Sequence, residues 1–481
     1  MPDGLVAEYT AAGKDVLLFI KAPFVAPATT SPVDFDATFG GALPPQAREL
    51  LQLATLQRAK LADVLGDKNL DVRNLIAAVD AYLPSLWQLT ASLQAQEASL
   101  KLVRKLEFKW TSALSNKPKE LVVGHTLLFE TSFVLTIRAL AHRDAAQIAL
   151  ESNPEDFAQI SKELRTGAGI FDFLANDLLA RVGNGEAGER PLEMNRLVMA
   201  SLGALFLADA QRVAIAKALH TNASPSVVAK LLLGAAERYE FSARCITQIN
   251  KPSFDLLIPG LLEELGALPA ILRACAANAL AQMHWLRGEY AIGLTFAQDA
   301  THRLEIIRMG KGLQQSELQR HLVAATGRAR GLENEYMRDC SLVYFIKPAD
   351  SHQIQVPSGS FVMDPIAYEL PLAEIVSFVA VPGGAGPSSS TENRSVQSFW
   401  SSLWAKPVDS SSLGKEETVS ASQVSGAKGG HLPSTLQPEL PSPILSSTQS
   451  AAIPTPAGMD PGVFASLPLD IQREIASGQQ Q

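Results

Sequence analysis

The chain has 481 residues, of which 47% are apolar and 19% charged, enough apolar material for a sizeable core, so a wholly disordered chain is excluded. With 41 basic and 49 acidic residues the net charge is −8, and no basic excess is available to neutralise the phosphates of a nucleic acid. Three cysteines, none in a Cys-x-x-Cys pair, argue against a disulfide framework. No signal peptide, lipid-anchor motif or membrane span is apparent, so we expect a cytoplasmic protein.

Residues 1–380 are predicted to form a folded, mostly helical body. Apolar residues recur at three-to-four spacing in long stretches such as 46–65, 133–150 and 194–219. Strand signals are few, at 16–20 and 342–346, with Phe361 and Val362 as a further candidate. A hairpin pattern near 285–304 resembles a tetratricopeptide unit, without a fixed repeat length along the chain. The pattern predicts an all-α solenoid with a minor β element.

Composition changes abruptly after residue 380. Residues 381–458 contain 18 Ser, 9 Pro and 8 Gly, and such a segment cannot bury enough apolar surface to offset its ordering entropy. We therefore predict a disordered linker at 381–458, followed by a short ordered motif at 459–478.

No catalytic, cofactor or metal signature stands out. The eight histidines form no HExxH or i, i+4 pair. A formal G-x-G-x-x-G at 183–188 follows a predicted helix, whereas a dinucleotide site needs a preceding strand, so we interpret it as an interhelical loop. The sequence favours a binding or scaffolding protein over an enzyme.

Several segments together resemble the Bro-one domain family of Brox- and Alix-like endosomal-sorting adaptors. Their order and spacing along the chain are those of the family. The segments are Phe-Lys-Trp-Thr at 108–111, Thr-Gly-Ala-Gly-Ile-Phe at 166–171, Ala-Asp-Ala-Gln-Arg-Val at 208–213, Leu-Val-Tyr at 342–344 and Asp-Pro-Ile at 364–366. The third segment resembles the family's A-Q-A-Q-E-V run, from which Asp209 and Arg212 depart. The resemblance implies a boomerang-shaped helical domain with a tetratricopeptide-like core and a small sheet.

The resemblance also implies a partner, the C-terminal amphipathic helix of a Snf-type ESCRT-III subunit, bound in an apolar patch. Ser224 and Pro225 are good helix-start residues, and on the helix that follows Val227 and Leu231 share one face while Val228, Leu232 and Ala235 form another. We expect one face to pack on the core and the other to be free, although both could be buried between helices. By resemblance the ESCRT-III contacts are Ala214, Val227 and Leu231; Ala214 replaces a larger apolar residue of some members, which implies a shallower patch.

The C-terminal segment 460–475 closely resembles the ubiquitin-binding motif of translesion DNA polymerases. Pro468 must interrupt any continuous helix, which predicts two short helices with one small exposed apolar surface. By resemblance, the ubiquitin-binding residues are Val463, Phe464, Leu467, Pro468 and Ile471. Docking of this segment on its own body is the alternative.

In the linker, Trp400 and Leu403 fit the short motif read by ubiquitin-like autophagy modifiers. The function predicted from the sequence is thus a non-enzymatic ESCRT adaptor that binds ubiquitin or ubiquitinated cargo, is recruited to endosomes, and meets the membrane only indirectly. The alternatives are a Bro-one scaffold in autophagy or Rho-type GTPase signalling, and an enzyme with a polar pocket in the helical body.

Overall fold

The computed structural model describes residues 28–39, 43–96, 105–180, 190–309, 316–350, 354–371 and 373–378, all within one compact unit, Met1–Ser390. The expected strand at 16–20, the linker and the C-terminal motif lie outside the described residues. The fold below therefore concerns the helical body alone.

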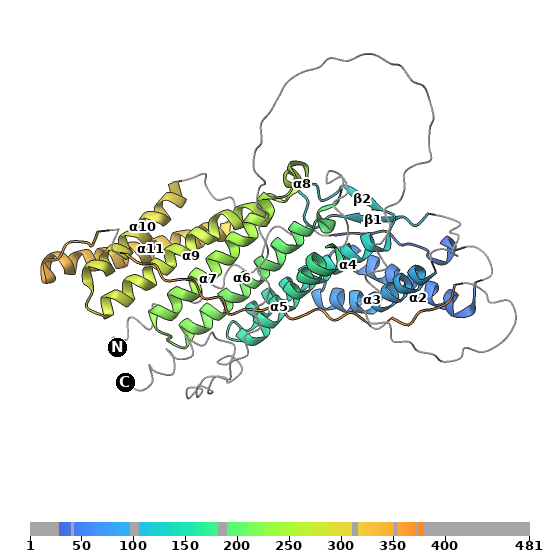
Figure 1. The fold of residues 1–481 in the computed structure, drawn as a ribbon, viewed down its shortest axis with the longest axis horizontal. Helices are drawn as coiled ribbons and strands as arrows, with labels where there is room; N and C mark the ends of the chain where they lie inside the picture. The colour runs from blue at the N-terminus through green and yellow to red at the C-terminus, as the bar shows by residue number, and fades with distance from the viewer. Residues whose placement is uncertain are drawn as a thin grey trace, which may run out of the picture. The chain divides into compact units, whose positions relative to one another are not determined.

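The body is an array of long helices that pack side by side largely in chain order (Figure 1). They are α2 (Pro45–Gly66), α3 (Val72–Ala95), α4 (Leu127–Ser152), α5 (Phe157–Phe173), α6 (Arg196–His220), α7 (Pro225–Thr247), α9 (Pro259–Leu286), α10 (Tyr290–Met309) and α11 (Ser316–Asp339). Short helical segments link or extend them: η1 (Asp36–Thr38), η3 (Leu174–Leu178), η4 (Leu192–Met194), α8 (Lys251–Leu256) and η5 (Cys340–Tyr344). The prediction of a mostly helical body is confirmed.

Polar side chains fix where several helices begin. Thr126, Asp156 and Asn195 each accept a hydrogen bond from a main-chain N–H in the first turn of α4, α5 and α6. Ser224 does the same for α7, with Pro225 as its first residue. The helix start predicted at Ser224 is therefore confirmed.

One two-stranded antiparallel sheet pairs β1 (Phe108–Thr111) with β2 (Leu121–Gly124), Phe108 facing Gly124. Trp110 of β1 is fully buried, and its Nε1 donates to the Glu130 carboxylate of α4 at 2.7 Å. The same carboxylate accepts hydrogen bonds from Arg58 of α2 at 2.8 Å and from the Tyr82 hydroxyl of α3 at 3.2 Å. The Phe-x-Trp segment thus anchors the sheet to three helices.

One expectation about secondary structure differs from the structure. The strand expected at 342–346 is wrong: Cys340–Tyr344 continues α11 as a π-helical turn, which the Ile346 N–H to Cys340 carbonyl bond and a left-handed Phe345 terminate. Among the described helices, α6 alone is long and apolar enough to cross a membrane, although no span was expected. Its apolar window is 89% buried inside the body, as in a core helix.

Candidate functional site

The α6–α7 hairpin positions the three residues predicted to contact ESCRT-III. The Gln211 Nε2 on α6 donates to the Leu231 carbonyl on α7 at 3.2 Å, which fixes how the two helices align. Ala214 lies three residues beyond Gln211, and Val227 lies four residues before Leu231. Because the two helices are antiparallel neighbours, this alignment brings all three predicted residues to the same end of the hairpin.

The predicted contact residues differ in their exposure. Val227 is 4% exposed and Leu231 3% exposed, whereas Ala214 is half-buried. Both apolar faces of α7 are buried, because α6 and α9 pack on the helix and a later segment of the chain crosses it near Lys230 and Gly234. The expectation of a free face is therefore wrong, and the alternative, burial between helices, describes Val227 and Leu231. Their role in binding stays a prediction.

The chain that crosses α7 is extended over residues 354–371 and 373–378, which we call the strap; Figure 1 shows it as the orange trace running over the helices. The Ser360 N–H donates to the Lys230 carbonyl of α7 at 2.8 Å. Gln211 donates to the Ser360 carbonyl at 2.8 Å and accepts from the Val362 N–H at 3.1 Å. Phe361 and Val362 are therefore extended, as the sequence suggested, but a side chain rather than a strand pairs with them.

Further along, the strap is held on α5 and α3. Arg165 of α5 donates to the Asp364 carbonyl at 2.7 Å, and its own carbonyl accepts from the Ile366 N–H at 3.1 Å. The Tyr368 ring packs on Phe173 with ring centres 5.1 Å apart. Gln96, the residue directly after α3, donates to the Val376 carbonyl at 2.7 Å and accepts from the Phe378 N–H at 2.6 Å. The strap thus ties the middle of the helical array to its α3 end.

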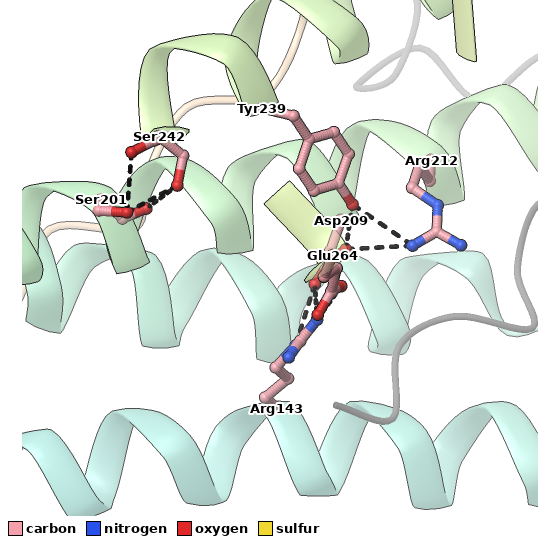
Figure 2. Close-up of polar contacts among 7 residues, drawn as sticks. All are labelled: Arg143, Ser201, Asp209, Arg212, Tyr239, Ser242 and Glu264. Carbon is pink, nitrogen blue, oxygen red and sulfur yellow. Dashed lines mark hydrogen bonds and ion pairs between the residues drawn. The ribbon is translucent and has the colours of Figure 1, made fainter. Parts of the chain in front are cut away.

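A buried charged network joins four helices, α4, α6, α7 and α9 (Figure 2). Arg143 of α4 donates to Asp209 of α6 at 2.7 Å and to Glu264 of α9 at 3.0 Å. Arg212 of α6 pairs with Asp209 at 3.2 Å, and the Tyr239 hydroxyl of α7 donates to Asp209. All five side chains are buried, so this network holds the helices that carry the candidate contacts in one arrangement.

Burial and neighbouring charges shift the pKa values of three groups in this network, Glu264, Tyr239 and Arg143. Burial raises the pKa of Glu264 to about 7, although Arg143 opposes the rise. Burial also raises the pKa of the Tyr239 hydroxyl, and the Asp209 carboxylate adds to the effect. For Arg143, burial lowers the pKa, but the charges of Asp209 and Glu264 outweigh it and the pKa is raised. Two guanidinium groups thus face two carboxyl groups in a buried network that joins α4, α6, α7 and α9.

In the sequence, Asp209 and Arg212 stand out only as departures from the run of the family that the chain resembles. Their spacing of three residues, with opposite charge on an otherwise apolar helix, was the available signal for a buried pair.

Ser201 and Ser242 make a second polar contact between α6 and α7, with their hydroxyl oxygens 2.8 Å apart (Figure 2).

The enzyme alternative raised by the sequence predicts a buried polar cavity that brings histidine and carboxylate side chains together. A hollow of about 460 Å³ between α10 and α11 is lined by His302, Glu305 and Glu333 but is open to solvent. The Glu305 carboxylate there is held by Arg330 at 2.6 Å. Within the described ranges no group of three or more His, Cys, Asp or Glu side chains is arranged to hold a metal ion.

Comparison with known families identifies both recognisable parts of the chain. Residues 46–374 match the BRO1-like domain, and residues 451–481 match the ubiquitin binding region. Because the first match spans more than half of the chain, the protein belongs to the BRO1-domain family. The resemblance inferred from the sequence is confirmed.

Similar curated proteins are called BRO1 domain-containing protein BROX. The human protein is 27% identical over 226 residues, which cover 46% of this chain and 53% of the relative. The orangutan protein (Pongo abelii) is 28% identical over the same length and shares. The chain therefore matches these relatives over about half of their length.

Solved structures show the same fold. The ALIX BRO1 domain in complex with CHMP4C aligns with a TM-score of 0.55 at 16% identity, covering 74% of this chain and 98% of that chain. A Bro1 domain described as a structural basis for endosomal targeting aligns with a TM-score of 0.53 at 15% identity, covering 70% and 93%. At these identities the likeness establishes the BRO1 fold.

Proposed function

We propose that this protein is a non-enzymatic endosomal-sorting adaptor. Its BRO1 domain binds the C-terminal amphipathic helix of a Snf-type ESCRT-III subunit, and its C-terminal motif binds ubiquitin on modified cargo. The observation that carries the proposal is the presence of both matched regions in one chain, at residues 46–374 and 451–481. The solved complex of the ALIX BRO1 domain with CHMP4C, which shares the fold, supports an ESCRT-III subunit as the partner.

In this proposal the chain has three parts with separate tasks. Residues 1–380 form the ESCRT-III-binding domain, 381–458 form a flexible spacer, and 459–478 form the ubiquitin-binding motif. Tethering two modest sites through a spacer raises the effective concentration of the second, so neither contact has to be tight. The protein is cytoplasmic and reaches endosomes through these partners.

Ala214 offers the cleanest test of the ESCRT-III site, because it is half-buried whereas Val227 and Leu231 are buried. An aspartate at 227 or 231 would bury a charge and unfold the domain, which would confuse loss of binding with loss of structure. We expect Ala214→Asp in the full chain to weaken binding of a labelled ESCRT-III helix peptide by about tenfold or more, measured by fluorescence anisotropy.

Ala59 provides a matched control for this test. It is a half-buried alanine on α2, which lies at one end of the helical array, away from the α6–α7 hairpin in its middle (Figure 1). Ala59→Asp should leave the peptide affinity unchanged, and circular dichroism should show that both variants keep the helical content of the parent protein. Undiminished binding by a folded Ala214→Asp variant would show that the helix binds elsewhere.

A further inference from the structure

In the described part of the chain, the small sheet has one open edge. β1 lies in the middle of the sheet, because β2 pairs with one side of it and Thr30 pairs with Trp110 from the other side. β2 therefore has a neighbour on one side only. No hydrogen bond from another described residue reaches the far side of β2, so its outward main-chain groups can pair with a further strand.

The hydrogen bonds on the opposite side of β1 show which residues of β2 face this edge. The Thr111 N–H donates to the Thr29 carbonyl at 2.9 Å, and the Lys109 carbonyl accepts from a hydroxyl of the same segment at 2.7 Å. The main chain of Thr111 and Lys109 therefore points away from β2. Their partners in the register are Leu121 and Val123. Because residues opposite each other in an antiparallel pair both point inward or both point outward, the N–H and carbonyl groups of Leu121 and Val123 face the open edge.

The side chains at this edge are apolar and exposed. Leu121 is 56% exposed and Val123 is 47% exposed. They are two residues apart in a strand and share one face, whereas Val122 between them lies opposite the buried Trp110. The edge thus offers two outward pairs of main-chain groups beside two apolar side chains, which is the arrangement that binds an extended peptide as an added strand.

The surroundings of β2 are positively charged, although the chain as a whole is acidic. Residues 105–125 contain four lysines and two glutamates, and each glutamate pairs with a lysine of the same segment, at 2.6 and 3.0 Å. The other two lysines, Lys105 and Lys119, are exposed. Lys119 lies just before β2, and Lys105 lies just before β1, whose first residue pairs with the last residue of β2. The antiparallel register therefore places one lysine beyond each end of the open edge.

We propose that β2 is a docking site for an extended segment of a partner protein, apolar in its centre and acidic at its ends. The segment adds to the sheet beside β2, its apolar centre covers Leu121 and Val123, and its acidic ends meet Lys105 and Lys119. A second copy of this chain fits less well, because pairing β2 with β2 would bring the lysines of the two copies together. This docking site is separate from the α6–α7 hairpin and from the ubiquitin binding region, and it does not rest on the adaptor function.

Residue-resolved hydrogen exchange of the full chain tests the proposal, with the synthetic peptide Glu-Asp-Val-Thr-Val-Asp-Glu as the probe. If the peptide adds as a strand, exchange slows at the outward N–H groups of Leu121 and Val123. The N–H of Val122 faces β1 in the free protein, so its exchange should change little. A contact through side chains alone would not produce this alternation.

A proline at position 123 blocks the edge while keeping the sheet. Val123→Pro removes one outward N–H, and proline is tolerated in an edge strand where that N–H faces solvent. Val123→Thr is the matched control, because threonine keeps the N–H and favours a strand. We expect Val123→Pro to weaken binding of the labelled peptide about tenfold or more, measured by fluorescence anisotropy, and Val123→Thr to weaken it about threefold or less.

A double variant, Lys105→Glu with Lys119→Glu, tests the charge of the partner segment. It should weaken peptide binding about tenfold at low salt, and the difference from the parent protein should shrink as salt is added. The control is Lys162→Glu with Lys347→Glu, which makes the same change of net charge at two exposed lysines elsewhere in the body and should leave the affinity unchanged.

Three results would overturn the proposal: absence of peptide binding, bound peptide that leaves exchange at Leu121 and Val123 unchanged, and full affinity in a Val123→Pro variant whose circular dichroism matches that of the parent. If Val123→Pro does not fold, the exchange pattern and the lysine variants decide. Protection of Leu121 and Val123 that grows with protein concentration in the absence of peptide would show that a second copy occupies the edge, and would also overturn the proposal.

Discussion

Asp209 and Arg212 lie three residues apart on α6 and neutralise each other inside the helical array, with carboxylate and guanidinium 3.2 Å apart and both side chains buried (Figure 2). These are the two positions at which the chain departs from the A-Q-A-Q-E-V run that it resembles. The arginine reverses the charge of the glutamate in that run, and the aspartate provides the opposite charge beside it. The two departures therefore compensate each other within one turn of one helix.

This arrangement predicts a large cost for removing the carboxylate alone. Asp209→Asn leaves Arg212 and part of Arg143 without their negative partner in a buried site, and breaking a buried ion pair by removing one partner typically costs about 3–5 kcal/mol. We expect the free energy of unfolding to fall by about that amount, measured by urea denaturation with linear extrapolation.

An exposed ion pair on α10 gives the comparison. Arg303 and Asp299 are 2.6 Å apart, but their side chains are 48% and 37% exposed. Asp299→Asn should cost less than about 1 kcal/mol, because water already solvates both charges. Equal costs for the two aspartates would mean that burial does not make the Asp209 network stabilising.

A second buried carboxyl group predicts a dependence of stability on pH. Glu193 in η4 is buried, and burial raises its pKa from the ordinary 4.5 to about 7, although a hydrogen bond of 2.5 Å from Ser112 and main-chain N–H groups oppose the rise. The folded state thus binds this proton more tightly than the unfolded state does. Its stabilisation is fully present below pH 4.5 and is lost as pH rises through about 7.

The free energy of unfolding is measured for the parent protein and for Glu193→Gln from about pH 5 to pH 8. Glu193 of the folded protein titrates within this range. The glutamine keeps the shape of the protonated acid and does not titrate. We expect the difference in unfolding free energy between the two proteins to change across this range by on the order of 2 kcal/mol, in favour of the variant at high pH. A constant difference would mean that Glu193 titrates alike in the folded and unfolded states.

The sequence predicted the helical body because its signals are local. The cap at Ser224, the proline after it and the three-to-four spacing of apolar residues each depend on neighbours within a turn or two. Segment 342–346 was predicted incorrectly for the same reason: five consecutive apolar residues resemble a strand, but here they continue a helix end and are largely exposed. Apolar runs of this length do not distinguish the two by themselves.

Local sequence signals could not predict the path of the strap or the burial of both α7 faces. The strap meets Gln211 about 150 residues away in sequence and Gln96 about 280 residues away, and it does so through its main chain, which leaves no pattern in residue type. Two apolar faces on α7 are compatible with a free surface or with packing on both sides. Only the three-dimensional packing of α6 and α9 on α7 and the measured exposure of its side chains show that both faces are buried.

Gly169 on α5 provides an independent measure of how firmly the strap is seated. A Cβ atom there would lie 1.7 Å from the Ile366 carbonyl oxygen, a main-chain atom that cannot yield without moving the strap. Gly169→Ala should lower the free energy of unfolding by about 1–3 kcal/mol and speed hydrogen exchange at Ile366, whose N–H bonds to the Arg165 carbonyl. Gly327→Ala on α11, where a Cβ meets nothing within 4 Å, should be neutral or slightly stabilising, because alanine favours a helix over glycine.

The C-terminal motif makes a prediction that does not depend on the helical body. In the full chain, replacing both Leu467 and Pro468 by alanine should abolish binding to labelled ubiquitin, because both lie in the region matched to the ubiquitin binding region and are the residues that the resemblance predicts to contact ubiquitin. The change is followed through the amide NMR shifts of isotope-labelled ubiquitin. Affinity for the ESCRT-III helix peptide should be unchanged in the same variant, and shifts that persist in it would place ubiquitin binding elsewhere in the chain.

The last prediction concerns the depth of the proposed ESCRT-III patch. Ala214 replaces a larger apolar residue found in some members that the chain resembles, and it is half-buried at the end of the α6–α7 hairpin. Ala214→Phe adds apolar surface that a bound amphipathic helix would cover, at about 25 cal/mol for each Å² removed from water. We therefore expect it to bind the labelled helix peptide about tenfold more tightly, measured by anisotropy, with Ala59→Phe on α2 as the matched control. A phenylalanine at 214 has to extend outward, because the hairpin is already packed. Weaker binding by a folded Ala214→Phe variant would therefore show that the bound helix approaches the α6 backbone closely. The shallow patch would then be the form suited to this protein's own partner.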